Sequence, residues 1–152
     1  MRLTLLAITL SALAASTFAA DYYITTPEGY NVSSFGADIH VGAGAQAWAL
    51  DQLSADLRKN WHVIHQGEFH VRFPSFKEGE YAWRTDTPVI YRMEEDAGYF
   101  YLIPLETDKP ENRLAWTVEG AQSASLTYPL WLRLRAYTRA PNQRFRFTKI
   151  TT

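Results

Sequence analysis

The segment FGADIHVGAGAQA, residues 35–47, decides how the rest of the sequence is interpreted. Apolar side chains recur at every second position between glycine or polar residues, at Ala37, Ile39, Val41 and Ala43. That period is typical of a β-strand with one apolar side. The glycines leave gaps, so this narrow strand cannot hold a hydrophobic layer alone. It has the shape of a strand that enters a groove in a larger body.

The first twenty residues, MRLTLLAITLSALAASTFAA, have the order of a secretory signal peptide. Arg2 precedes an apolar run from Leu3 to Ala15, and small residues follow up to Ala20. The run is too short to span a membrane, and the small-residue rule places cleavage after Ala20. The sequence therefore predicts export of the chain, without membrane insertion.

The composition limits how the exported chain is stabilised and what it binds. The sequence has no cysteine, so disulfide bonds cannot stabilise it, whereas five Trp and nine Tyr supply large surfaces for burial. Removal of Arg2 with the signal leaves 14 basic against 16 acidic side chains. This near-neutral balance gives no general reason to expect nucleic acid or an anionic membrane as a partner.

Two segments near the start of the exported chain interrupt the strand pattern. Residues 21–33 contain a short strand pattern broken by the turn sequence at Pro27, and we expect an N-terminal leader or an edge strand there. Residues 48–60, WALDQLSADLRKN, place Leu50, Leu53 and Leu57 at helical spacing. This spacing predicts one short amphipathic helix.

From Trp61 onward the sequence has the alternation of a β protein. Turn residues separate strands predicted at residues 61–66, 69–73, 81–84, 89–93, 99–105, 114–118, 126–138 and 144–150. Strands at this spacing with one helix predict an all-β domain over residues 34–152, an immunoglobulin-like antiparallel β-sandwich. A small closed barrel is the alternative architecture.

The strand predicted at residues 126–138 has the most regular alternation. Leu130, Leu132, Leu134 and Ala136 are expected to face the core. The opposite side then carries a ladder of aromatic and arginine side chains that suits a binding partner, namely Trp131, Arg133, Arg135 and Tyr137. The alternative is a solvated face whose long side chains cover apolar surface.

The sequence contains no pattern that indicates catalysis, a metal or a cofactor. His62 and His65 project to opposite faces of a strand and cannot form the helical histidine pair of zinc enzymes. The acidic run at residues 94–96 lies at an expected hairpin turn and lacks the spacing of a calcium loop. No nucleophile elbow, phosphate loop or dinucleotide fingerprint occurs, so we expect a protein that is not an enzyme.

Two stretches carry a resemblance to a known family. GADIHVGAGA at residues 36–45 and WHVIHQG at residues 61–67 resemble the N-terminal region of cysteine-free fimbrial subunits of the chaperone–usher pathway. The segment SLTYPLWLRLRAYT, residues 125–138, is similar to the apolar late strand of those subunits. The leader and the C-terminal extension from Arg139 depart from the pattern, and the short chain fits a minor subunit better than a major one.

The resemblance implies an incomplete pilin domain that lacks its last strand and is completed by a strand from another chain. Its partners would be a periplasmic chaperone, an outer-membrane usher and neighbouring subunits of an extracellular fimbrium that contributes to cell adhesion. The donated strand would use Ala37, Ile39, Val41 and Ala43. The edge strand beside the groove would use Phe145, Phe147 and Ile150.

The sequence leaves other interpretations open. The segment at residues 37–43 is equally consistent with an ordinary strand that pairs inside its own domain. The alternative function is a self-contained exported binding module for a carbohydrate or a host protein. Its stacking platform would be formed by Trp83, Trp131, Tyr137 and neighbouring aromatic residues.

Overall fold

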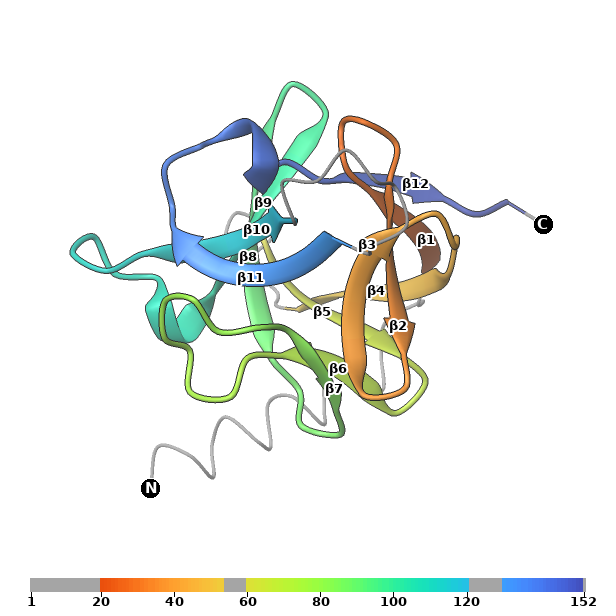
Figure 1. Ribbon diagram of the computed structural model, residues 1–152, viewed down its shortest axis with the longest axis horizontal. Coiled ribbons are helices and arrows are strands. Elements are labelled where there is room, and N and C mark those ends of the chain that lie inside the picture. Colours follow the sequence, from red (N-terminus) through yellow and green to blue (C-terminus); the bar gives the residue numbers. More distant parts are fainter. Residues whose placement is uncertain (1–19, 54–59, 121–129, 152) are drawn as a thin grey trace.

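The computed structural model describes residues 20–53, 60–120 and 130–151 of the chain. Its described part consists of twelve strands and two short 3₁₀ turns, η2 (Leu105–Thr107) and η3 (Pro141–Gln143) (Figure 1). The strands are β1 (Ala20–Thr25), β2 (Asn31–Phe35), β3 (Asp38–Gly42), β4 (Ala47–Leu53), β5 (Trp61–Gln66), β6 (Phe69–Arg72), β7 (Trp83–Thr85), β8 (Ile90–Asp96), β9 (Tyr99–Pro104), β10 (Leu114–Glu119), β11 (Leu130–Ala136) and β12 (Arg146–Lys149).

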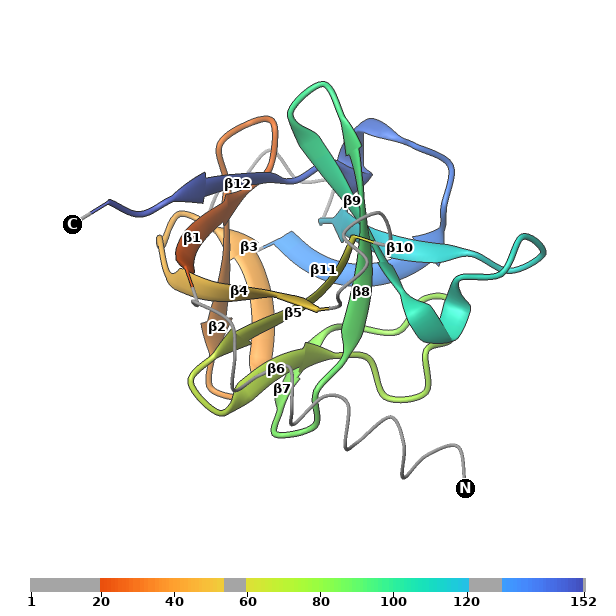
Figure 2. The ribbon, with the colours of Figure 1, turned by 180° about the vertical axis from the view of Figure 1, so that it is seen from behind.

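Six strands form a closed antiparallel barrel. Neighbouring strands pair in the order β1, β4, β5, β8 and β9, and β12 pairs with β1. The circuit closes where Phe100 of β9 and Phe145, just before β12, exchange backbone hydrogen bonds of 2.7 and 3.0 Å. Figure 2 shows β12 running past both β1 and β9. Each barrel strand therefore finds both neighbours in its own chain.

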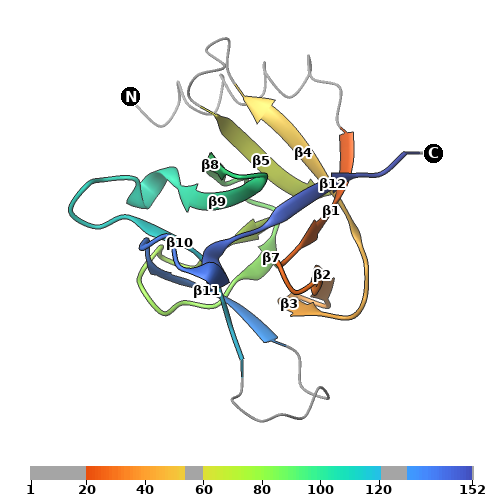
Figure 3. The same ribbon diagram turned by 90° about the horizontal axis from the view of Figure 1, so that it is seen from above.

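The other six strands form three hairpins at one end of this barrel: β2 with β3, β6 with β7, and β10 with β11. In turn β3 pairs with β7 and with β11, and a bridge between Tyr81 and Arg133 joins the remaining side. Strands β1 to β7 thus also form a closed seven-strand ring. In Figure 3 the hairpin strands β2, β3 and β11 lie below the barrel strands.

One hydrophobic core joins the barrel to the hairpins. Trp48 of β4 is buried, and its indole nitrogen donates a 2.8 Å hydrogen bond to the carbonyl oxygen of Val32 in β2. Tyr91 of β8 lies edge-on to Trp116 of β10, with 5.3 Å between ring centroids. The aromatic residues thus fill the interior, as expected for a cysteine-free domain. The core includes Ile24, Val32, Ile39, Trp48, Ile64, Tyr91, Leu102, Trp116, Leu132 and Phe145.

The structure is all-β, but the prediction of an immunoglobulin-like sandwich is wrong. A sandwich has two sheets with free edges, whereas these strands close into rings. The spacing of strands and turns is the same for both architectures, and only the long-range pairing distinguishes them. The incomplete pilin-type sandwich is therefore corrected to a closed all-β fold.

The predicted helix at residues 48–60 is also wrong over its described part. Residues 47–53 form β4, which pairs with β1 on one side and β5 on the other. Leu53 is buried in a small cluster with Val63 and Ile90, while Leu50 packs against the main core. Hydrogen bonds to two neighbouring strands therefore override the local helical spacing. Leu57 lies outside the described residues.

Residues 21–33, assigned from the sequence to a leader, include parts of two strands. Tyr22 in β1 pairs with Trp48 on one side and with Lys149 on the other, and Ile24 is buried in the core. The barrel therefore includes this segment. In the described part of the chain, no helix is long and apolar enough to cross a membrane.

Candidate functional site

Three strands, one from each hairpin, meet where they pair with one another, and each presents two outward side chains. The cross-strand neighbours are Asp38 with Trp83, Tyr81 with Arg133, and Trp131 with His40. In each strand the two positions are two residues apart, so both side chains lie on the same side of the sheet. We call this surface the axial face, formed by Asp38, His40, Tyr81, Trp83, Trp131 and Arg133.

The burial of the residues between these positions shows that the axial face points toward solvent. Ile39, Ala82 and Leu132 lie in the core, with at most 4% of each residue exposed. Tyr81, Trp83 and Trp131 are 49%, 43% and 38% exposed. Large aromatic residues half open to water on one surface are typical of a binding site.

Four side chains of the axial face contact one another in a continuous row, with tilted and edge-on rings. The ring centroids of His40 and Trp131 are 4.8 Å apart, and those of Trp131 and Tyr81 are 5.5 Å apart. The guanidinium carbon of Arg133 lies 4.3 Å from the centroid of the Tyr81 ring. These contacts hold the rings in place before any ligand arrives, which lowers the entropic cost of binding.

The charge of Arg133 is already satisfied within the protein. Its Nε donates to the carbonyl oxygen of Gly79 at 2.9 Å, and its Nη1 donates to Glu119 at 3.1 Å. Arg135 also donates to Glu119, and this hydrogen bond is the main cause that holds the pKa of Glu119 below its usual range. Glu119 therefore stays ionised between two guanidinium groups.

Asp38 differs from Arg133 because its carboxylate is open. It is exposed and makes no side-chain hydrogen bond or ion pair to the described residues. Its cross-strand neighbours are Trp83 on β7 and Phe35 on β2, and Phe35 is 81% exposed. Directly opposed residues project to the same side of a sheet, so two exposed rings flank a free carboxylate.

The sequence-predicted partner-binding face is only partly assembled. Trp131 and Arg133 belong to the axial face, and Arg135 reaches it through Glu119. Tyr137 lies beyond the end of β11, where its ring stacks edge-on against Tyr101 at 5.3 Å. Asp38, His40 and Tyr81 also belong to this surface but were not predicted from the sequence to lie on it. For Tyr81, the alternation in Tyr81-Ala82-Trp83 was the available signal.

The segment proposed as a donated strand is a strand of this domain. Ile39 and Val41 are fully buried in β3, which pairs with β2 and β11 of the same chain. Ala37 lies in the turn before β3, and Ala43 is exposed just after it. The arrangement corresponds to the second interpretation of this segment, a strand that pairs inside its own domain.

The residues proposed to border an open groove are also paired within the chain. Phe145 is fully buried at the bridge to Phe100, and Phe147 pairs with Ile24 of β1. The Ile150 N–H donates a 2.9 Å hydrogen bond to the carbonyl oxygen of Asp21. One edge of β12 is therefore paired with β1, and the residue just before β12 is bridged to β9.

A histidine cluster lies on β5 and β6, away from the axial face. The two ring nitrogens of His65 lie 2.8 Å from a carboxylate oxygen of Asp51 and 2.9 Å from the carbonyl oxygen of Gly67. The His70 ring is 5.4 Å from His65. Burial, reinforced by the charge of His65, lowers the pKa of His70 to about 4. The described residues include no group of three or more His, Cys, Asp or Glu arranged for a metal ion.

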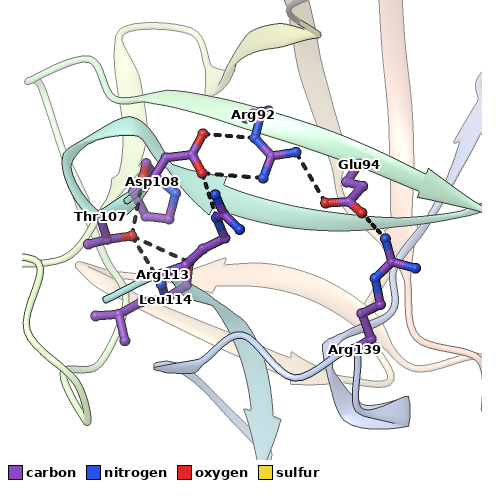
Figure 4. Close-up of polar contacts among 8 residues, drawn as sticks. Arg92, Glu94, Thr107, Asp108, Arg113, Leu114 and Arg139 are labelled. Carbon is purple, nitrogen blue, oxygen red and sulfur yellow. Dashed lines mark hydrogen bonds and ion pairs between the residues drawn. The ribbon is translucent and has the colours of Figure 1, made fainter. Parts of the chain in front are cut away.

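A network of ion pairs ties β8 to the segments around β9 and β10 (Figure 4). Arg92 donates two hydrogen bonds to Asp108, at 2.8 and 3.2 Å, and one to Glu94, at 3.1 Å. Arg113 donates to Asp108 at 2.7 Å, and Arg139 donates to Glu94. Burial alone raises the pKa of Asp108, but these hydrogen bonds outweigh it and hold the pKa below its usual range. With its charges paired internally, this network is structural.

Comparison with known proteins identifies the architecture. No protein-family model matches the sequence, and no curated protein matches it. A solved structure that matches is a designed 3-fold symmetric protein, ThreeFoil, with a TM-score of 0.60 and 14% sequence identity. The match covers 86% of this chain and 99% of the designed chain.

The chain has a β-trefoil-like fold. The closed barrel and the three hairpins agree with this assignment, with four successive strands in each third of the chain. The axial face then lies where the three hairpins of the trefoil meet. At this level of identity the likeness concerns the fold alone, so function has to be argued from the residues of the site.

Proposed function

We propose that this protein is an exported, non-catalytic binding module that holds its ligand on the axial face. The observation that carries the proposal is the exposure of Tyr81, Trp83 and Trp131 on one surface, in a chain whose core already buries other aromatic residues. Export is proposed from the signal-like residues 1–20.

The physical basis is that an exposed indole or phenol ring offers a large apolar area to a ligand. Such rings lose little conformational entropy on binding because Trp131 and Tyr81 are already held by mutual contact. Asp38 borders the rings and supplies a hydrogen-bond acceptor, and Arg133 packs against the ring of Tyr81. This combination of apolar area and convergent polar groups suits recognition of a ligand.

The test uses the chain from Asp21 to Thr152 and a double variant, Trp83→Ala with Trp131→Ala. Binding is measured by cosedimentation with insoluble cellulose, chitin and peptidoglycan, and by retention on immobilised mucin and collagen. We expect binding to at least one of these materials, with a loss of about tenfold or more in the double variant.

The matched control is Tyr23→Ala, which removes a half-exposed aromatic side chain from β1, away from the axial face. This variant should bind as the parent chain does, and the melting temperatures of all three proteins show whether each is folded. Equal binding by the parent chain and the double variant would contradict the proposal, as would absence of binding to every material.

A further inference from the structure

We infer that the ligand is an uncharged saccharide whose sugar ring stacks on Trp83 while Asp38 accepts hydrogen bonds from its hydroxyl groups. This inference rests on the proposed function and specifies the ligand class and the contact residues. Three properties of the axial face support it. Within the described residues, the carboxylate of Asp38 is unpaired and the ring of Trp83 is free, and a protein interface would bury the carboxylate without a matched cation.

The free charge on the axial face argues against an anionic ligand. Arg133 donates through Nε to Gly79 and through Nη1 to Glu119, so its charge is paired with a carboxylate inside the protein. Asp38 has no such partner among the described residues, and its carboxylate would repel an anion. A ligand that donates hydrogen bonds therefore suits this position.

The row of contacting side chains argues against an organic cation. Arg133 already lies over the face of Tyr81, at 4.3 Å, and His40 packs against Trp131. A second cation on these rings would be close to the guanidinium group, and like charges repel. Trp83 has no such ring or cation contact in the described chain, and so offers a free ring beside Asp38.

A saccharide can bind to the Asp38 carboxylate and to the Trp83 ring at the same time. One side of a pyranose ring presents C–H groups that stack on an indole, and its hydroxyl groups donate hydrogen bonds to a carboxylate. Phe35, on the opposite side of Asp38, provides a second exposed ring against the same ligand. Aromatic rings and a carboxylate therefore converge on one sugar.

A protein partner fits this position less well. A protein interface would bury Asp38 among apolar rings and would have to supply a matched cation, since a buried unpaired carboxylate is strongly unfavourable. Arg133 is not available for this role because Glu119 and Gly79 hold it. Sugar hydroxyl groups satisfy the carboxylate without an added charge.

The experiment measures binding of separate probes by saturation-transfer NMR and calorimetry. The neutral probes are the methyl glycosides of glucose, galactose, mannose and N-acetylglucosamine, with cello- and chito-oligosaccharides as longer forms. Sialic acid is the anionic probe, and tetramethylammonium is the cationic probe. We expect at least one neutral probe to bind and neither charged probe to bind.

Three variants locate the contact. Asp38→Asn keeps the shape of the side chain and removes its charge, and it should weaken sugar binding about tenfold. Trp83→Ala should weaken it by tenfold or more, and Tyr23→Ala should leave it unchanged. Sugar binding that is unaltered in Asp38→Asn and Trp83→Ala would overturn the inference, as would Asp38-dependent binding of tetramethylammonium.

The outcomes also separate this inference from the proposed function. Binding to collagen alone, if it is lost in the Trp83 and Trp131 double variant, would contradict the inference of a saccharide ligand but support the proposed binding function. If no material and no probe binds, both proposals fall together. Loss of sugar binding in the two axial variants, with unchanged melting temperatures, would support both.

Discussion

At the scale of single residues, Gly79 shows why the axial face requires a particular backbone conformation. Its φ is +89°, a region that side-chain-bearing residues rarely adopt, and its carbonyl oxygen accepts the hydrogen bond from Arg133. An added Cβ would lie 3.4 Å from Arg135 Nη1 and 3.6 Å from Arg133 Nη2, which is ordinary contact. The strain therefore comes from the backbone rather than from crowding.

We predict that Gly79→Ala lowers the free energy of unfolding by about 1 kcal/mol or more, because alanine is strained at positive φ. Urea denaturation measures this change. The control is Gly98→Ala, at φ +85° with open space around it, which carries the same strain far from Arg133. Only the Gly79 variant should also weaken ligand binding. A Gly79→Ala variant as stable as the parent chain would contradict the inference that the positive φ at this position strains alanine.

The half-buried imidazole of His70 predicts a dependence of stability on pH. Its pKa is lowered from 6.5 to about 4, first by burial and then by His65, while Asp51 and Asp86 oppose the shift. Between these two pH values the unfolded chain binds a proton that the folded chain does not. Stability is therefore full above about pH 6.5, falls as the pH is lowered, and levels off below about 4.

We expect this group to contribute about 1 to 2 kcal/mol of that change, because water partly screens the half-buried ring. The measurement compares urea denaturation of the parent chain and His70→Gln across this range. The difference between the two proteins isolates the contribution of His70 from that of the carboxylates, which both proteins share. A parallel pH profile for the two proteins would show that His70 is not responsible.

At the scale of elements, alternation along a strand could be interpreted correctly from the sequence. In β11, Leu132 and Leu134 are buried while Trp131 is exposed, as predicted. Ala136, expected in the core, is the last residue of β11 and is exposed. The period of a strand gives its buried side, but the point at which burial stops depends on the neighbouring strands.

The helix at residues 48–60 could not be excluded in the same way. Leu50 and Leu53 are spaced as on one face of a helix, but in β4 they project to opposite sides, Leu50 toward the main core and Leu53 into the small cluster. What decides the matter is that Trp48 bonds to Val32 and that β1 and β5 flank β4. These are long-range contacts, and a local pattern contains no information about them.

At the scale of the whole molecule, the closure of the strands into a barrel could not be predicted from the sequence. The barrel closes through pairs such as Tyr22 with Lys149, which lie near opposite ends of the chain. The candidate site depends on the same kind of contact, because Trp131 meets His40 only through the pairing of β11 with β3. The sequence therefore predicted Trp83 and Trp131 of the site, but not Tyr81 or the carboxylate and histidine beside them.

Closure leads to a prediction about the chain on its own. The chain from Asp21, expressed without a chaperone, should be a monomer that unfolds cooperatively, because the barrel closes within the chain through the pairing of β12 with β1 and the bridge between Phe100 and Phe145. Light scattering after size-exclusion chromatography measures the mass, and urea denaturation measures cooperativity. A synthetic peptide of residues 35–47 should change neither, since β3 already occupies its place. If the chain instead aggregates and this peptide restores a soluble monomer, a strand is missing from the domain and the ring is open in solution.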